Sequence, residues 1–206
     1  DFLEPDFLYI NQGNGTFKDE ILTYFKHISY NSMGSDFADI NNDLNPDLLV
    51  LDMMAEDHIR GKENMATMST DNFWSLVNAG YHHQYMSNML QLNNGEGFFS
   101  EIGQLSAVAK TDWSWAPIIA DFDNDGHGDV AVGWQKPGST QYQNQVTNSA
   151  GAVFWNDGNM DWSKLWTELP SNYFGANGIA NDMETMDING DGYLDIILAS
   201  TKVDPY

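Results

Sequence analysis

The sequence predicts an all-β fold of the β-propeller type, with about three blades' worth of four-stranded antiparallel sheets and a small helical insertion. Three observations carry this prediction. An acidic motif occurs three times, a short apolar run follows each copy, and a second motif rich in Asn and Gly precedes each copy at a nearly constant distance. Repetition at this spacing is typical of folds built from similar supersecondary units.

The acidic motif reads Asp-x-Asp/Asn-x-Asp-x-x-x-Asp. Its copies span residues 39–47, 121–129 and 187–195, and the apolar runs that follow them are residues 48–51, 130–132 and 196–199. An apolar run of about four residues between turn residues is too short for a typical helix and is typical of a strand buried on both faces. Each copy therefore predicts a loop that leads into a buried strand.

The second motif predicts tight hairpin turns. It reads NQGNGTF from Asn11 and NNGEGFF from Asn93, with a looser third copy, NDGNMDW, from Asn156. Asn and Gly tolerate the positive φ angles that such turns require. These asparagines precede the first Asp of the next acidic motif by 28, 28 and 31 residues, so the two motifs belong to one repeating unit.

The repeating unit is a four-stranded antiparallel sheet: strand, acidic loop, strand, connection, strand, Asn-Gly turn, strand. Complete units are expected at about residues 36–101 and 115–168, with half a unit at each end of the chain. Propellers have about four to eight blades, so we interpret residues 1–206 as a segment of a larger propeller.

The acidic loops are candidate calcium sites. Calcium takes six to eight oxygen ligands, and side chains at alternating positions 1, 3 and 5, a carbonyl at position 7 and a carboxylate at position 9 could supply them. The predicted ligands are Asp39, Asn41, Asp43, Asn45 and Asp47 in the first loop, Asp121, Asp123, Asp125, His127 and Asp129 in the second, and Asp187, Asn189, Asp191, Tyr193 and Asp195 in the third.

An EF-hand and a solvated turn without metal are the two alternatives to this calcium prediction. An EF-hand requires a Glu at position 12, where this chain has Val50, Val132 and Leu198, and helices on both sides of the loop. A solvated turn without metal remains the simpler alternative. It is strongest for the first loop, where Leu44 replaces the glycine expected at position 6 and Pro46 precedes the closing Asp47.

Residues 56–88 are expected to form a helical insertion within the first complete unit. Asp71 is a candidate N-cap of a short helix, and Gly80 suits its C-terminal end. Trp74, Tyr81 and Tyr85 form a candidate surface for a glycan or protein ligand, and the alternative is that they only pack the insertion onto the sheet. His82 and His83 are adjacent, so their side chains do not converge and zinc binding is not expected.

The composition restricts the classes of function. The formal net charge of -22 disfavours nucleic acid as a partner, and Arg60 is the only arginine. The chain has no cysteine and no apolar run of the length of a membrane-spanning helix. Basic residues are scarce and nucleophile motifs are absent, so we expect no enzymatic activity. A calcium-dependent polysaccharide lyase, in which a cation neutralises a uronate and a base removes a proton, is kept as an alternative.

The motifs resemble the FG-GAP/VCBS repeats of integrin α-subunit propellers and of bacterial surface proteins. The stretch MLQLNNGEGFFSEIGQLSAVAKTDWSWAPIIADFDNDG is most similar to the branch that includes cartilage acidic protein and its Bacteroidota relatives. The resemblance covers nearly the whole chain outside residues 136–150. It implies calcium-binding loops and an extracellular or cell-surface module that binds proteins or glycans. An architectural subunit of a bacterial envelope assembly is the alternative within the non-enzymatic class.

Overall fold

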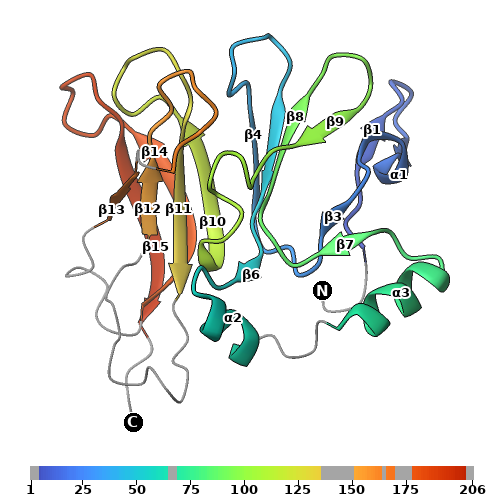
Figure 1. Cartoon of the computed structure of the whole chain (residues 1–206). Coiled ribbons are helices and arrows are strands. Elements are labelled where there is room, and N and C mark those ends of the chain that lie inside the picture. The colour runs from blue at the N-terminus through green and yellow to red at the C-terminus, as the bar shows by residue number, and fades with distance from the viewer. Residues whose placement is uncertain (1–4, 65–68, 136–150, 164–165, 170–177, 203–206) are drawn as a thin grey trace.

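The protein is all-β with few helices, as the sequence predicted (Figure 1). The computed structural model describes residues 5–64, 69–135, 151–163, 166–169 and 178–202, and every structural statement here concerns those residues. The sheets stand side by side in an open row, and the described strands do not close into a ring (Figure 1). None of the described helices is both long and apolar enough to cross a membrane.

The first complete sheet has four antiparallel strands in the order β4-β5-β8-β9. The strands are β4 (Ser35–Ala38), β5 (Asp47–Val50), β8 (Met89–Asn93) and β9 (Phe99–Glu101). The first acidic loop joins β4 to β5, and the Asn-Gly turn at Asn93 joins β8 to β9. This is the strand order expected for one repeating unit.

The second sheet has the same antiparallel core and one added strand, in the order β13-β12-β11-β10-β6. Its strands are β10 (Asp112–Ala120), β11 (Asp129–Gln135), β12 (Gly151–Phe154), β13 (Trp166–Glu168) and β6 (Met53–Met54). The short strand β6 lies between β5 and β8 along the chain and pairs with the start of β10. It extends the sheet from four strands to five and ties the two units together.

A two-stranded hairpin lies at each end of the row. Strands β1 (Tyr9–Asn11) and β2 (Phe17–Asp19) flank the first Asn-Gly turn, and a single helical turn, α1 (Ile21–Tyr24), follows them. Strands β14 (Gly178–Met186) and β15 (Asp195–Lys202) flank the third acidic loop. Each end therefore carries one half of the repeating unit.

Two helices fall within residues 56–88: α2 (His58–Asn64) and α3 (Thr70–Asn78). Ser69, and not Asp71, caps α3, because its hydroxyl accepts the Asn72 N–H at 3.1 Å. Gly80 has a φ of 96° just past the helix, as expected for a C-terminal glycine. A short parallel pair, β3 (Ile28–Ser29) with β7 (Gln84–Tyr85), anchors the end of this segment.

The core lies between neighbouring sheets. One apolar cluster, which includes Leu49, Leu90 and Val130, fills the space between the two complete sheets. A second cluster packs the β14–β15 hairpin onto the second sheet, and a third packs α1 onto the first sheet.

The apolar runs differ in how far they are buried. Those at 48–51 and 130–132 contribute to both faces of their sheets, as predicted. The run at 196–199 does not, because no described sheet covers its outer face, and Ile197 is 45% exposed.

Candidate metal centre

The three acidic loops lie along the same edge of the molecule, the upper edge in Figure 1, and the helices α2 and α3 lie at the opposite edge. The loops join β4 to β5, β10 to β11 and β14 to β15, so the first and last aspartates of each loop stand at the ends of adjacent antiparallel strands. The sheet hydrogen bonds thereby hold positions 1 and 9 close to each other.

The backbone folds each loop around the carboxylate at position 1. In the second loop the Asp121 carboxylate accepts N–H groups from Asp125 at 3.2 Å and Gly126 at 3.0 Å. The Asp125 N–H also donates to Asp123 at 3.1 Å, and Asp125 itself accepts the His127 N–H at 2.8 Å. These bonds fix the side chains before any ion is bound.

The first and third loops repeat these bonds position by position. Asp39 and Asp187 accept the N–H groups of positions 5 and 6 at distances of 2.8 to 3.2 Å. The amide oxygens of Asn41 and Asn189 take the place of the Asp123 carboxylate and accept the N–H of position 5. All three loops therefore share one conformation.

In the first and second loops the closing aspartate links the loop to the Asn-Gly turn of the same sheet. In the second loop Asp129 accepts the Phe122 N–H at 3.0 Å with one oxygen and the Asn156 N–H at 2.8 Å with the other. Asp47 forms the same two bonds, with Ile40 at 3.0 Å and Asn93 at 2.8 Å. The link joins residues 46 apart in the first sheet and 27 apart in the second, so the insertion between loop and turn does not break it.

The closing carboxylates are electrostatically unfavourable when no cation is bound. Asp47 and Asp129 are fully buried. Burial raises the pKa of both carboxyl groups above the ordinary value, the backbone hydrogen bonds partly offset this, and neighbouring aspartates of the same loop raise the pKa further. By contrast, the pKa of Asp43 is lowered, chiefly by the hydrogen bond from the Asn45 N–H. A divalent cation would neutralise the charges that burial disfavours.

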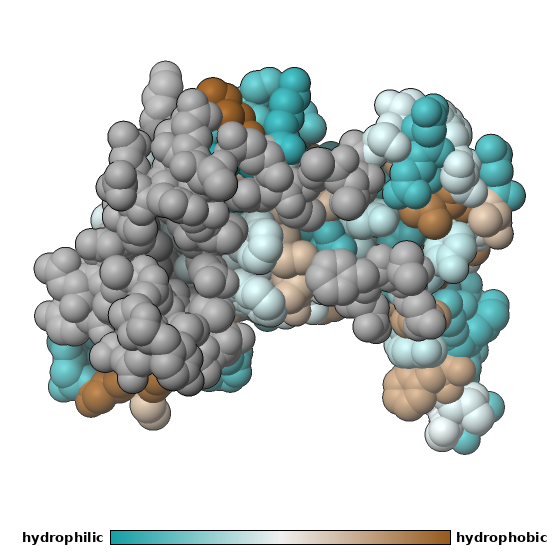
Figure 2. Space-filling model, turned by 90° about the horizontal axis from the view of Figure 1, so that it is seen from below, coloured by the Kyte–Doolittle hydropathy of each residue, from teal (hydrophilic) through white to brown (hydrophobic). Residues whose placement is uncertain are grey.

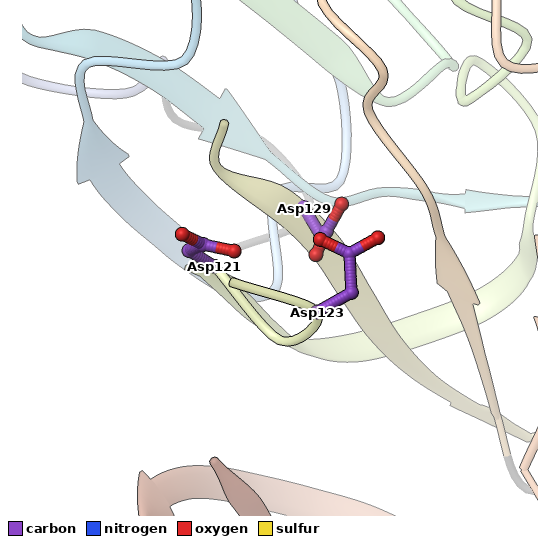
Figure 3. Close-up of side chains that lie close together, drawn as sticks. All are labelled: Asp121, Asp123 and Asp129. Carbon is purple, nitrogen blue, oxygen red and sulfur yellow. The ribbon is translucent and has the colours of Figure 1, made fainter. Parts of the chain in front are cut away.

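The second loop brings its carboxylates together. Asp121, Asp123 and Asp129 each offer one carboxylate oxygen, and these atoms lie within 4.8 Å of one another. Figure 3 shows an oxygen of Asp121 directed toward the carboxylates of Asp123 and Asp129. Oxygens 2.3 to 2.6 Å from a shared ion are separated by such distances, so the geometry fits calcium. Asp125 is not part of this group of three, and its role as a ligand stays a prediction.

The remaining predicted ligands take their expected places in the loops, but the structure does not test their contact with an ion. Asn45 and Tyr193 donate backbone N–H groups to position 5, at 2.8 and 2.9 Å. The imidazole of His127 lies against the Asn-Gly turn at Gly158 and is 3.1 Å from the Asn42 amide. Carbonyl ligation by Asn45, His127 and Tyr193 stays a prediction.

Asn42 and Asn124, at position 4 of the first and second loops, connect successive loops. The sequence analysis did not predict this role. The Asn42 amide donates to the carbonyl of Gly126 at 2.9 Å, and the Asn124 amide donates to the carbonyl of Gly192 at 2.9 Å. Both asparagines have a φ near 60°, a conformation that Asn tolerates better than most residues. The signal in the sequence was Asn, Asn and Gly at position 4, but only the packing of the sheets shows the partner.

The predicted ligand surface divides into two parts. Trp74 on α3 and Tyr85 on β7 join one aromatic group through Phe73, whose ring centroid lies 5.2 Å from that of Trp74 and 5.1 Å from that of Tyr85. Trp74 is 52% exposed and Tyr85 is 45% exposed. Tyr81 instead lines a separate hollow of about 250 Å³ beside Leu22.

The adjacent histidines do not form a metal group. His82 Nε2 lies 3.0 Å from the Phe25 carbonyl, and its Nδ1 accepts the His83 N–H at 2.6 Å. Burial lowers the pKa of His82, and the neighbouring His83 and His27 lower it further. The ring contacts of His83 are with Phe73 and Trp74. His82 is therefore a buried, hydrogen-bonded part of the fold.

Comparison with known proteins yields one family. A family model described as FG-GAP-like repeat matches residues 4–50, 71–132 and 144–198. These segments make up most of the chain and include all three acidic loops. Among curated proteins no sequence matches this chain.

Proposed function

The chain belongs to the family of FG-GAP-like repeat proteins, and we propose that it works as a calcium-binding extracellular module that binds a protein or a glycan. The observation that carries the calcium part is the convergence of carboxylate oxygens from Asp121, Asp123 and Asp129 within 4.8 Å. The other two loops repeat the same backbone bonds, so we propose calcium sites there as well.

The ion is proposed to stabilise the fold rather than to take part in catalysis. Each loop stands where two strands of a sheet meet, and in the first two loops the closing aspartate also holds the Asn-Gly turn of the same sheet. A catalytic ion needs an open coordination position and a neighbouring base. His127 is the basic residue of the second loop, and its imidazole packs on Gly158 and lies 3.1 Å from the Asn42 amide. We therefore propose that the module is not an enzyme, and the lyase alternative has no supporting observation.

An extracellular location is proposed from the chemistry of the loops. Calcium loops of modest charge bind in the millimolar range, and calcium reaches such concentrations outside cells. Family membership supports the same location. An architectural role in an envelope assembly is compatible with the same loops. The bound partner distinguishes the two roles: a glycan or protein ligand favours the binding module, and other subunits of an assembly favour the architectural role.

The exposed aromatic group on α3 and β7 is the proposed ligand surface. Planar rings stack on sugar faces and on apolar side chains. Figure 2 views the side of the molecule that carries the helices, and its visible coloured surface mixes hydrophilic and hydrophobic patches.

Calcium binding is tested by titration calorimetry and thermal unfolding of the chain and of Asp123→Ala. Asp123 is exposed and accepts one backbone N–H, so its loss should remove a ligand with little effect on the metal-free fold. We expect calcium to raise the melting temperature of the parent chain, and Asp123→Ala to bind one calcium ion fewer.

The matched control for this experiment is Asp157→Ala. Asp157 is also exposed and also accepts a backbone N–H, at 3.0 Å, but it lies in an Asn-Gly turn. It should keep the full calcium response. An unchanged melting temperature on adding calcium to the parent chain would contradict the structural role, and equal losses in both variants would contradict the assignment of the site.

Ligand binding is tested with an array of glycans and with Trp74→Ala. We expect the substitution to weaken binding at least about fivefold, because stacking on an aromatic face contributes about 1 to 3 kcal/mol when it is lost. Trp166→Ala is the control, since Trp166 is 44% exposed on β13 and remote from α3 along the sequence. Equal effects of the two substitutions would exclude the α3 surface as the binding site.

A further inference from the structure

Asparagine followed by glycine occurs three times in the part of the chain that the structure describes, at residues 14–15, 94–95 and 189–190. Such an asparagine can react with the next backbone nitrogen, because glycine has no Cβ atom to hinder the approach. The three pairs have the same two residues but different surroundings in the fold. We propose that the fold makes Asn14 a site of self-deamidation, assisted by Thr16, and protects Asn94 and Asn189.

The reaction at Asn14 consumes water and releases ammonia. The Gly15 nitrogen attacks the side-chain carbonyl carbon of Asn14 and loses its proton to water, and negative charge gathers on Oδ1 of the tetrahedral intermediate. Collapse of this intermediate breaks the bond to Nδ2, expels ammonia and leaves a cyclic succinimide. Water then opens the ring at either carbonyl and gives aspartate or isoaspartate. No oxidant or reductant is needed.

The backbone nucleophile is free in the first pair and occupied in the other two. The Gly15 N–H forms no hydrogen bond within the described part of the chain. The Gly95 N–H donates to the side chain of Asn93 at 3.0 Å, and the Gly190 N–H donates to that of Asp187 at 2.7 Å. An N–H held in this way must give up its hydrogen bond before its nitrogen attacks, and that raises the barrier.

Two donors polarise the carbonyl that is attacked. Oδ1 of Asn14 accepts the backbone N–H of Thr16 at 3.0 Å and the hydroxyl of Thr16 at 2.6 Å. Both donors lie at the oxygen on which negative charge develops, so they stabilise the intermediate as an oxyanion hole does. Because these donors lie two residues on, the side chain folds over the Gly15 nitrogen between them.

The other two asparagines lack this combination. Oδ1 of Asn189 accepts the Asp191 N–H at 2.9 Å, so its side chain forms the same turn. The carboxylates of Asp187 and Asp191, which accept hydrogen bonds from this segment, would oppose a developing negative charge there. The side-chain amide of Asn94, which must leave in the reaction, donates to the hydroxyl of Ser100 at 3.0 Å.

The tip of the turn is open in a complete sheet as well. Asn14 and Gly15 are exposed. Glu96 and Gly97 take the same places in the turn of the first complete sheet, and both are exposed. A Cβ atom at Gly15 or Gly97 would meet no atom within 4 Å. Water therefore reaches the tip when a sheet has all its strands, so the reaction does not depend on what packs beside the first hairpin.

Deamidation would change both the charge and the length of this turn. Aspartate adds a negative charge, and isoaspartate also adds a carbon atom to the main chain. A hydrogen bond of 2.9 Å from the Gln12 N–H to the Thr16 carbonyl spans the turn, and the longer chain of isoaspartate should break it. The product would hold the hairpin of β1 and β2 less tightly. The inference does not depend on the proposed ligand or on calcium.

The test is peptide mapping by mass spectrometry after incubation of the metal-free chain at mildly alkaline pH, both folded and in urea. The unfolded chain is the matched control, because only the local sequence acts there. In urea we expect similar rates at the three asparagines. In the folded chain the rate at Asn14 should be at least as high as in urea. The rates at Asn94 and Asn189 should fall at least about fivefold, since a hydrogen bond must first be given up.

Two substitutions at Thr16 isolate the role of its hydroxyl. Thr16→Val keeps the backbone N–H and the size of the side chain but removes the second donor, so it should slow deamidation of Asn14 in the folded chain several-fold. Thr16→Ser should restore the rate, and in urea neither substitution should matter. Equal rates at the three asparagines in the folded chain, a slower rate at Asn14 when folded than in urea, or no effect of Thr16→Val would overturn the proposal.

Discussion

At the scale of single residues, the backbone conformation of the acidic loops constrains which residues suit positions 4 and 6. Positions 4 and 6 have positive φ in all three loops, and glycine or asparagine occupies five of these six places. Leu44 is the exception, with a φ of 69° and a side chain that is 91% exposed. A leucine there adopts a strained backbone conformation and buries no apolar surface in return.

Leu44→Gly should therefore stabilise the fold. A non-glycine residue in the left-handed region costs about 1 to 2 kcal/mol, and the greater freedom of glycine in the unfolded chain offsets about 0.5 to 1 kcal/mol of the gain. We expect the free energy of unfolding, measured with urea, to rise by about 0.5 kcal/mol. Leu44→Ala keeps the Cβ atom and should bring no such gain, so an equal gain in both variants would point to the loss of the exposed side chain instead.

At the scale of elements, a buried ion pair fastens the inserted helix α2 to the second sheet. Arg60 on α2 donates two hydrogen bonds to the Asp112 carboxylate at the start of β10, at 2.6 and 2.8 Å. The side chains of Arg60 and Asp112 are only 12% and 2% exposed. The sequence marked Arg60 as the single arginine, but its partner is 52 residues away and was not predictable from spacing.

Arg60→Ala should destabilise the protein strongly, because it leaves the buried Asp112 carboxylate without its cation. Removing one partner of a buried pair costs about 3 to 5 kcal/mol. Urea unfolding monitored by tryptophan fluorescence would measure the loss. Lys62→Ala removes an exposed cation from the same helix and is the control. A loss below about 1 kcal/mol would show that the pair is no stronger than a surface salt bridge.

At the scale of the whole molecule, the repeat explains both the order of the sheets and the complementary hairpins at the ends. Each complete sheet covers one face of its neighbour, so the interior sheets are buried on both faces. The terminal hairpins each have a neighbour on one side within the described chain, and their apolar residues remain partly exposed. The formal net charge of -22 opposes non-specific association of such surfaces through like-charge repulsion.

The sequence alone determined the strands, the loops and the family. Alternation of short apolar runs with Asp-rich and Asn-Gly turns is a local property, because turn conformation and strand preference depend on neighbouring residues. For the same reason the positions of Asp121, Asp123 and Asp129 in one loop were predictable. The conformation of the first loop was predictable too, in spite of Leu44, since its hydrogen bonds involve residues close in sequence.

Only the tertiary structure decided which distant groups meet. The packing of whole sheets brings Asn42 to Gly126 and Asn124 to Gly192. It also pairs Arg60 with Asp112. The same packing places Trp74 and Tyr81 on two separate surfaces. Such contacts depend on how apolar faces are buried against each other, and local sequence patterns do not encode that choice.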